Sequence, residues 1–134
     1  MKIIYQLTIN MSNSLLIACK NRKSFLDYLH NNPGAIVIYL TATWCKPCGK
    51  ISGPVTELIN RVSCNTILCA KLDVDEYADL FTFLRSRKMV TGIPTILCYF
   101  KGNTSFVPDD SVSGSDIPSI NSFFSRVWEE AGNF

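Results

Sequence analysis

The stretch Ala42-Thr43-Trp44-Cys45-Lys46-Pro47-Cys48 decides how this chain is interpreted. Two cysteines separated by two residues follow the apolar run 35–40, and a helical pattern of apolar residues begins at about Lys46. This arrangement holds two sulfurs close enough to cycle between dithiol and disulfide. It also places the first sulfur where the N–H groups of a helix N-terminus stabilise a thiolate. The motif itself leaves three interpretations open: a redox pair, a metal site and an incidental pair.

Strand-like and helix-like segments alternate on both sides of this motif. Short apolar runs rich in β-branched residues predict strands, and apolar residues three and four apart predict helices. The expected strands cover residues 14–18, 35–40, 66–74 and 95–100, with a weak one within 104–113, and the expected helices cover residues 21–31, 46–62, 75–88 and 116–128. Pro54 should kink the second helix. The order predicts an α/β fold with a central mixed sheet of four to five strands, flanked by about four helices.

Length, composition and charge fit one globular domain. The chain has 134 residues, of which 47% are hydrophobic, and we expect a single domain over 1–134 whose residues 1–13 form an N-terminal extension or a first strand. A net charge of +2 is too small to predict nucleic-acid binding. No apolar run approaches the roughly 20 residues that span a membrane, and polar residues interrupt the N-terminal stretch where a signal peptide needs a continuous apolar region. We therefore expect a cytoplasmic monomer that binds neither nucleic acid nor membranes.

The chemistry of the motif gives different roles to its two cysteines. An unperturbed thiol has a pKa of about 8.5, so little thiolate forms at neutral pH without help. The helix N-terminus and the charge of Lys46 favour the anion at Cys45, which is therefore the expected attacking thiolate. Cys48, one helical turn further along, is expected to resolve the mixed disulfide. Pro47 suits a first helical turn, and Trp44 offers a flat surface to a partner.

A second motif, Gly92-Ile93-Pro94-Thr95, stands directly before the fourth expected strand. Together with residues 44–48 and Lys71-Leu72-Asp73-Val74-Asp75, it makes the chain resemble the thioredoxin family over residues 14–128. The resemblance implies a thioredoxin fold and reduction of protein disulfides, with electrons from a reductase or from glutathione and with no bound cofactor or metal. It also implies that Pro94 is a cis proline packed against the cysteines. The implied docking surface for an extended substrate segment consists of Trp44, Lys46, Pro47, Gly92, Ile93 and Pro94.

Several positions depart from the family pattern. Tyr39 stands six residues before the first cysteine, where thioredoxins have a buried aspartate that assists proton transfer at the second cysteine. A phenol, with a pKa of about 10, is a poor base at neutral pH. Tyr39 and Lys71, the usual partner of that aspartate, are therefore the candidates for proton handling. Lys46 replaces the usual glycine, and we expect it to favour the thiolate and to raise the reduction potential.

Two alternatives stand beside this interpretation. Cys64 and Cys69, taken with the motif, superficially resemble a zinc ribbon, but their spacing is poor and Pro94 would be unexplained. The second function hypothesis is a redox-inactive thioredoxin-fold binding module within a larger assembly, motivated by the missing buried aspartate. The cysteines outside the motif are expected to be buried, inert thiols: Cys19, Cys64, Cys69 and Cys98. Cys64 is the expected exception, because its neighbours Ser63 and Asn65 are typical of an exposed loop.

Overall fold

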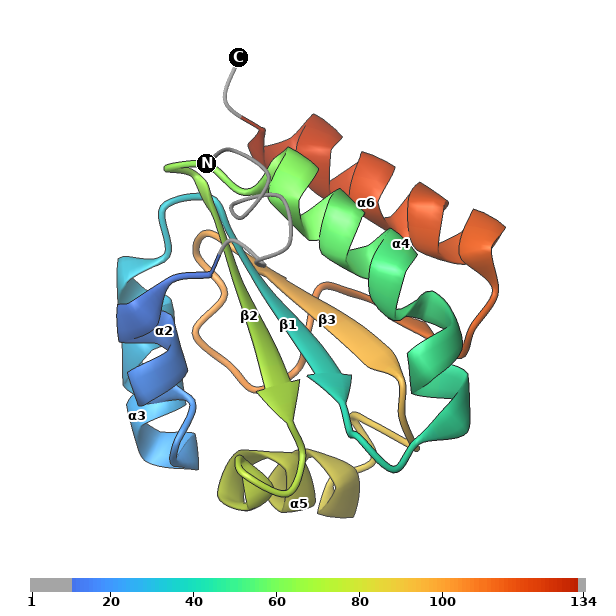
Figure 1. Ribbon diagram of the computed structural model, residues 1–134. Coiled ribbons are helices and arrows are strands. Elements are labelled where there is room, and N and C mark those ends of the chain that lie inside the picture. Colours follow the sequence, from blue (N-terminus) through green and yellow to red (C-terminus); the bar gives the residue numbers. More distant parts are fainter. Residues whose placement is uncertain (1–10, 133–134) are drawn as a thin grey trace, which may run out of the picture.

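A four-stranded mixed sheet forms the centre of the computed structural model, which describes residues 11–132 (Figure 1). The central strand β1 (Ala35–Thr41) runs parallel to β2 (Ile67–Asp73) and antiparallel to β3 (Thr95–Phe100), and the edge strand β4 (Asp110–Ser113) runs antiparallel to β3. Every residue of β1 is buried, as expected for an apolar run in a sheet that is covered on both faces. The predicted α/β fold with a central mixed sheet is confirmed.

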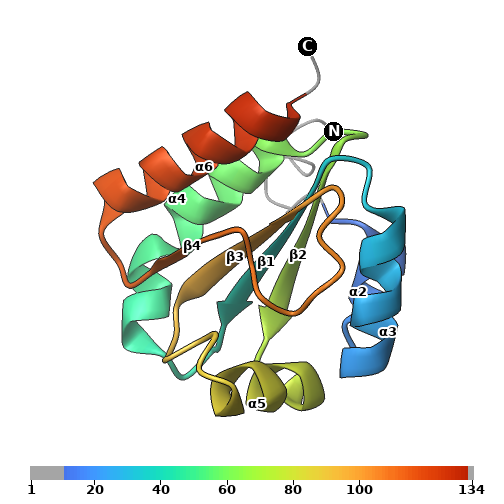
Figure 2. The ribbon, with the colours of Figure 1, turned by 180° about the vertical axis from the view of Figure 1, so that it is seen from behind.

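Helices cover both faces of this sheet (Figures 1 and 2). On one face, α4 (Lys46–Val62) and α6 (Ile117–Ala131) lie side by side. On the other face lie α2 (Asn13–Ala18) and α3 (Arg22–Tyr28), and α5 (Ala78–Ser86) packs near the end at which β1 and β2 finish. Among the described residues, no helix is long and apolar enough to cross a bilayer.

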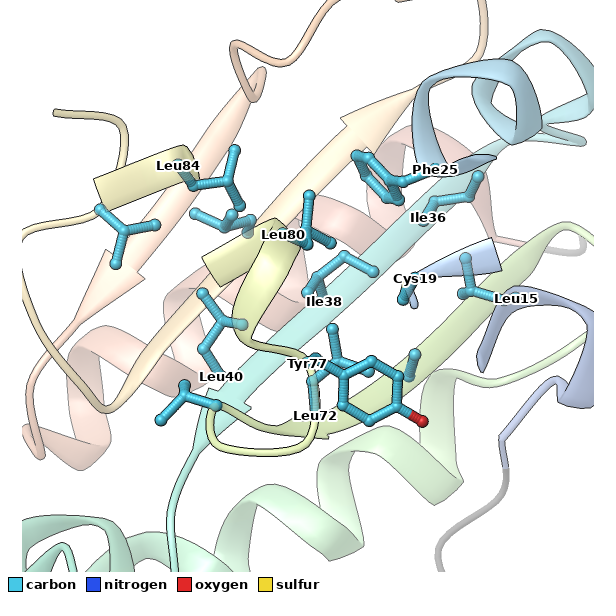
Figure 3. Close-up of a cluster of buried hydrophobic side chains, with 14 of the residues drawn as sticks. Leu15, Cys19, Phe25, Ile36, Ile38, Leu40, Leu72, Tyr77, Leu80 and Leu84 are labelled. Atoms are coloured by element: carbon cyan, nitrogen blue, oxygen red, sulfur yellow. The ribbon is translucent and has the colours of Figure 1, made fainter. Parts of the chain in front are cut away.

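The side chains of β1 alternate between two hydrophobic clusters, because successive residues of a strand point to opposite faces. Val37 and Tyr39 belong to the cluster under α4 and α6. Ile36, Ile38 and Leu40 belong to the other cluster, which Figure 3 shows together with Leu15, Phe25 and Leu80 from the helices. The sheet is therefore held from both sides, and the loop after β1 is fixed at the end of a rigid strand.

The strand predicted over residues 14–18 is wrong, because these residues form the helix α2. The hydroxyl of Ser12 caps this helix by accepting from the backbone N–H of Leu15 at 3.5 Å. Only one stripe is buried: Leu15 and Ala18, three residues apart, face the core, whereas Ile17 is 73% exposed. A short apolar run fits a strand or a helix equally well by periodicity, and here the cap and the buried stripe decide for the helix. Residues 1–10, within the proposed extension or first strand, lie outside the described residues.

The other expected elements are present with shifted ends. Asn21 caps α3, which continues into a 3₁₀ turn (Leu29–Asn31), and Asp116 caps α6. The helix expected over residues 75–88 begins only at Ala78, because turns follow β2 directly. α4 continues as a helix through Pro54, and its ribbon changes direction part-way along its length (Figure 1).

Candidate functional site

The two cysteines of the motif lie at the start of α4, directly after the carboxyl end of β1. Cys45 is the N-cap residue of the helix and forms a disulfide with Cys48, with 5.2 Å between the two Cα atoms. The backbone N of Cys48 lies 3.3 Å from Sγ of Cys45. An N–H group of the first helical turn, which has no backbone partner within the helix, therefore points at the first sulfur. Both residues are largely buried, Cys45 at 8% exposure and Cys48 at 2%. Cys45 is thus the more accessible of the two, in the place where a helix N-terminus favours a thiolate.

The segment before β3 lies against this pair from a distant part of the sequence. The Ile93–Pro94 peptide bond is cis, as predicted. The carbonyl oxygen of Ile93 lies 3.9 Å from Sγ of Cys45, and Pro94 itself is buried. The backbone oxygen of Pro94 accepts from the N–H of Gly114, a glycine with φ of 90°, at 2.9 Å. The fold therefore brings Ile93 and Pro94 to the disulfide, and Gly114, directly after β4, holds the Pro94 carbonyl.

Trp44 stands beside the disulfide as one of the most exposed large apolar side chains, with 66% exposure. Its indole Nε1–H donates to Oδ2 of Asp75 at 2.8 Å. Lys46 and Pro47, in the first turn of α4, are also exposed. Asp75 was not predicted as part of the site. Its position two residues after the neighbouring parallel strand could have indicated it, because the carboxyl ends of parallel strands meet at one edge of a sheet.

Tyr39 lies inside the core rather than at the sulfurs. Its side chain is fully buried, and among the described residues its Oη has no hydrogen-bond partner. Burial raises the pKa of the Tyr39 phenol; the nearby Thr41 hydroxyl opposes this shift but does not reach hydrogen-bonding geometry. Lys71, the other predicted proton-handling residue, is the register partner of Tyr39 on β2 and is half-buried.

A pocket of about 230 Å³ opens behind the disulfide, between the carboxyl ends of β1 and β2 and the first turns of α4. Both sulfur-bearing residues line it, together with polar side chains from β1, α4 and β2: Thr41, Ser52, Lys71 and Asp73. Tyr39 does not line it. The pocket is wide enough for several water molecules, so solvent can reach Cys48 from this side.

The remaining cysteines lie away from the pair. Cys19, Cys69 and Cys98 are buried, and burial raises the thiol pKa of Cys19 and of Cys69 to about 12 and that of Cys98 also far above its usual range. Cys64 is half-exposed, as expected, with its Sγ 3.2 Å from Oγ1 of Thr66. Within residues 11–132, no three His, Cys, Asp or Glu side chains form a group that could hold a metal ion.

The sheet order, the disulfide at a helix N-terminus and the cis proline opposite it define a thioredoxin-fold protein with a two-cysteine site. Residues 16–124 match the family model described as Thioredoxin, and the chain belongs to the thioredoxin family. The cysteine pair occupies the active-site position of this family, which supports a thiol–disulfide oxidoreductase function.

Individual thioredoxins are similar to the chain over much of its length. Thioredoxin-5 of Dictyostelium discoideum is 36% identical over 83 residues, which are 62% of this chain and 74% of that protein. The mitochondrial thioredoxin of Bos taurus is 29% identical over 103 residues, 77% of this chain and 57% of that protein. The chain thus spans little more than half the length of this mitochondrial relative. A crystal structure of Plasmodium falciparum thioredoxin superposes with a TM-score of 0.59 at 26% identity, covering 85% of this chain and 86% of that one.

Proposed function

We propose that this protein is a thiol–disulfide oxidoreductase that reduces or exchanges disulfides in protein substrates through the Cys45/Cys48 couple. The observation that carries the proposal is the Cys45–Cys48 disulfide at the N-terminus of α4, beside the cis Ile93–Pro94 bond. Two cysteines that can form a disulfide with each other can exchange it with the disulfide of a partner without a bound cofactor.

The reduced protein begins the reaction with the thiolate of Cys45. Its attack on a substrate disulfide forms a bond between Cys45 Sγ and one substrate sulfur and releases the other substrate sulfur as a thiolate. The N–H groups of the first turn of α4 and the charge of Lys46 stabilise the Cys45 anion. Cys48 then loses its proton and attacks Cys45 Sγ. This step restores the Cys45–Cys48 disulfide and releases the second substrate sulfur, so two electrons have passed to the substrate.

The surface around the disulfide fits an extended polypeptide. Trp44 supplies an exposed ring, and Gly92 and Ile93 are half-buried beside Cys45. A substrate segment would pair with the backbone of Ile93, and it would also meet Lys46 and Pro47, which are exposed in the first turn of α4. The hydrogen bond from Trp44 to Asp75 holds the ring in one orientation, which limits the side-chain entropy lost on binding.

A reductase or glutathione would return the disulfide to the dithiol, and the protein would act as a monomer. The cytoplasmic location stays a prediction; several of the curated relatives are mitochondrial by name.

Reduction of insulin by dithiothreitol tests the proposed activity. The wild-type protein should accelerate the appearance of insulin turbidity, and Cys45→Ser should abolish the acceleration. Cys64→Ser is the matched control, because it removes a half-exposed thiol outside the site. A wild-type rate equal to the uncatalysed rate would contradict the proposal. It would favour the redox-inactive binding module, for which the pair would stay in one redox state.

A further inference from the structure

Asp73 lines the pocket behind the disulfide together with Cys45 and Cys48, whereas Tyr39 does not. We propose that Asp73, acting through solvent in this pocket, accepts the proton of the Cys48 thiol when Cys48 resolves the mixed disulfide on Cys45. The inference rests on the proposed oxidoreductase function and names the proton acceptor for its second step. Asp73 is thus a proton-relay residue that does not itself touch the reacting sulfurs.

The register of the sheet explains why Asp73, and not Tyr39, reaches the pocket. β1 and β2 are parallel, with Tyr39 opposite Lys71 and Thr41 opposite Asp73, so all four residues share one face. Tyr39 lies two residues further back along β1, under the apolar side chains of α4. Thr41 and Asp73 are the last residues of their strands, and they face the first turns of α4, which carry Cys48.

The carboxylate of Asp73 is held in place with one oxygen available. Its Oδ1 accepts from the backbone N–H of Asp75 at 2.9 Å, and its backbone oxygen accepts from the N–H groups of Glu76 and Tyr77. Among the described residues, none donates a hydrogen bond to Oδ2. A carboxylate oxygen without a protein donor, on a residue that lines a solvent-accessible pocket, is suited to accept a proton from solvent.

The other titratable groups around the pocket are less suited to this step. Tyr39 is fully buried, and burial raises the pKa of its phenol, so it does not take a proton near neutral pH. Lys71 carries a positive charge, which stabilises a Cys48 thiolate but does not accept a proton. Asp75 is bound to Trp44 and does not line the pocket. Lys46 and Lys50, on α4, are exposed and do not line the pocket either.

The step balances in atoms and electrons. The Cys48 S–H bond breaks, and its proton passes through solvent to Oδ2 of Asp73. The Cys48 sulfur uses the freed electron pair to bond Sγ of Cys45. The bond between Cys45 and the substrate sulfur breaks, and the substrate leaves as a thiolate. Asp73 then returns the proton to bulk solvent.

Attack by Cys45 and resolution by Cys48 can be followed separately with an aromatic disulfide, dithiobis(nitrobenzoate). This reagent releases one coloured thionitrobenzoate anion at each exchange. Under single-turnover conditions, stopped-flow absorbance should show a first release from attack by Cys45 and a second from attack by Cys48. The Cys45→Ser/Cys48→Ser double variant gives the contribution of the other cysteines, to be subtracted. Asp73→Asn is the informative change, because the amide oxygen can still accept from the N–H of Asp75 while the base is lost.

We expect Asp73→Asn to slow the second release about tenfold or more at pH 7 and to leave the first release unchanged. The difference should shrink as the pH rises, because a larger fraction of Cys48 then ionises without a base. Glu76→Gln removes one negative charge three residues away, outside the pocket, and should match the wild type at every pH.

An Asp73→Asn profile that matches the wild type would overturn the inference, and so would a slowed second release in Tyr39→Phe but not in Asp73→Asn. An equal slowing in Glu76→Gln would assign the effect to general charge and would also overturn it. If the wild-type protein gives no second release, the proposed oxidoreductase function itself fails, which is a separate outcome.

Discussion

Replacing Tyr39 by phenylalanine should stabilise the protein, although most substitutions in a core destabilise it. The Tyr39 ring is fully buried among the side chains under α4 and α6, and phenylalanine keeps that packing. The hydroxyl that is lost has no hydrogen-bond partner among the described residues. A buried polar group without a partner costs about 1–3 kcal/mol. Because the Thr41 hydroxyl lies nearby and compensates in part, we expect a gain at the lower end, about 1 kcal/mol.

Urea denaturation of the oxidised protein measures this gain. With a slope of about 1–3 kcal/mol per M for a chain of this size, the unfolding midpoint of Tyr39→Phe should rise by roughly 0.3–1 M. Tyr99→Phe is the matched control: Tyr99 is equally buried, but its Oη donates to the Phe106 carbonyl at 2.7 Å. The free energy of unfolding of Tyr99→Phe should fall by about 1 kcal/mol, and its urea midpoint should fall with it. If the urea midpoint of Tyr39→Phe instead falls as that of Tyr99→Phe does, the Tyr39 hydroxyl is hydrogen-bonded in solution and the expected gain in stability is wrong.

Three further predictions concern the helix caps, the other cysteines and the response to acid. Asn21→Ala removes the side-chain oxygen that accepts from the N–H of Ser24 at 2.8 Å, and thermal unfolding should show a loss of about 1 kcal/mol, most of which Asn21→Asp restores; an unchanged Asn21→Ala would contradict the cap. In the reduced native protein at pH 8, iodoacetamide should modify Cys45 and Cys64. Cys19 and Cys69, with pKa values of about 12, should stay unmodified, and mass spectrometry of the peptides checks this. Labelling of Cys69 at the rate of Cys64 would contradict this prediction and show that β2 opens. Hydrogen bonds from Arg22 lower the pKa of Asp79, so the stabilisation it gives is present above the pKa of the unfolded chain and is lost as pH falls through the lowered value. Asp79→Asn should therefore flatten the acid side of the curve of unfolding free energy against pH. A variant curve identical to that of the wild type would mean that the Arg22–Asp79 pair contributes nothing to stability.

The sequence predicts the centre of this site well, because its two motifs have specific local geometry. A CxxC after an apolar strand and an Ile-Pro before another strand are local patterns, and the structure brings Cys45 within 3.9 Å of the Ile93 carbonyl oxygen. The cis bond before Pro94 followed from the family resemblance, not from spacing or composition.

The polar surroundings of the sulfurs were harder to predict, because they depend on register between strands. Asp75 contacts Trp44, and Asp73 lines the pocket behind Cys48, only because β2 is parallel to β1 with Thr41 opposite Asp73. Tyr39 was a candidate for proton handling by its position in the sequence. The structure places it in the buried core, and it is not among the residues that line the pocket. Residues 14–18 were assigned to a strand because a run of four apolar residues has no period that distinguishes strand from helix.

Redox titration of the cysteine pair tests the central claim most directly. The protein is equilibrated in glutathione buffers from roughly −330 to −150 mV, quenched in acid and alkylated, and its free thiols are counted by mass. We expect one two-electron transition that involves Cys45 and Cys48 and is absent in Cys48→Ser. Because of Lys46, its midpoint should lie above about −270 mV, the thioredoxin value. A midpoint at or below that value would contradict the role given to Lys46. A pair that stays in one redox state across the whole range would contradict the claim that Cys45 and Cys48 form a working redox couple.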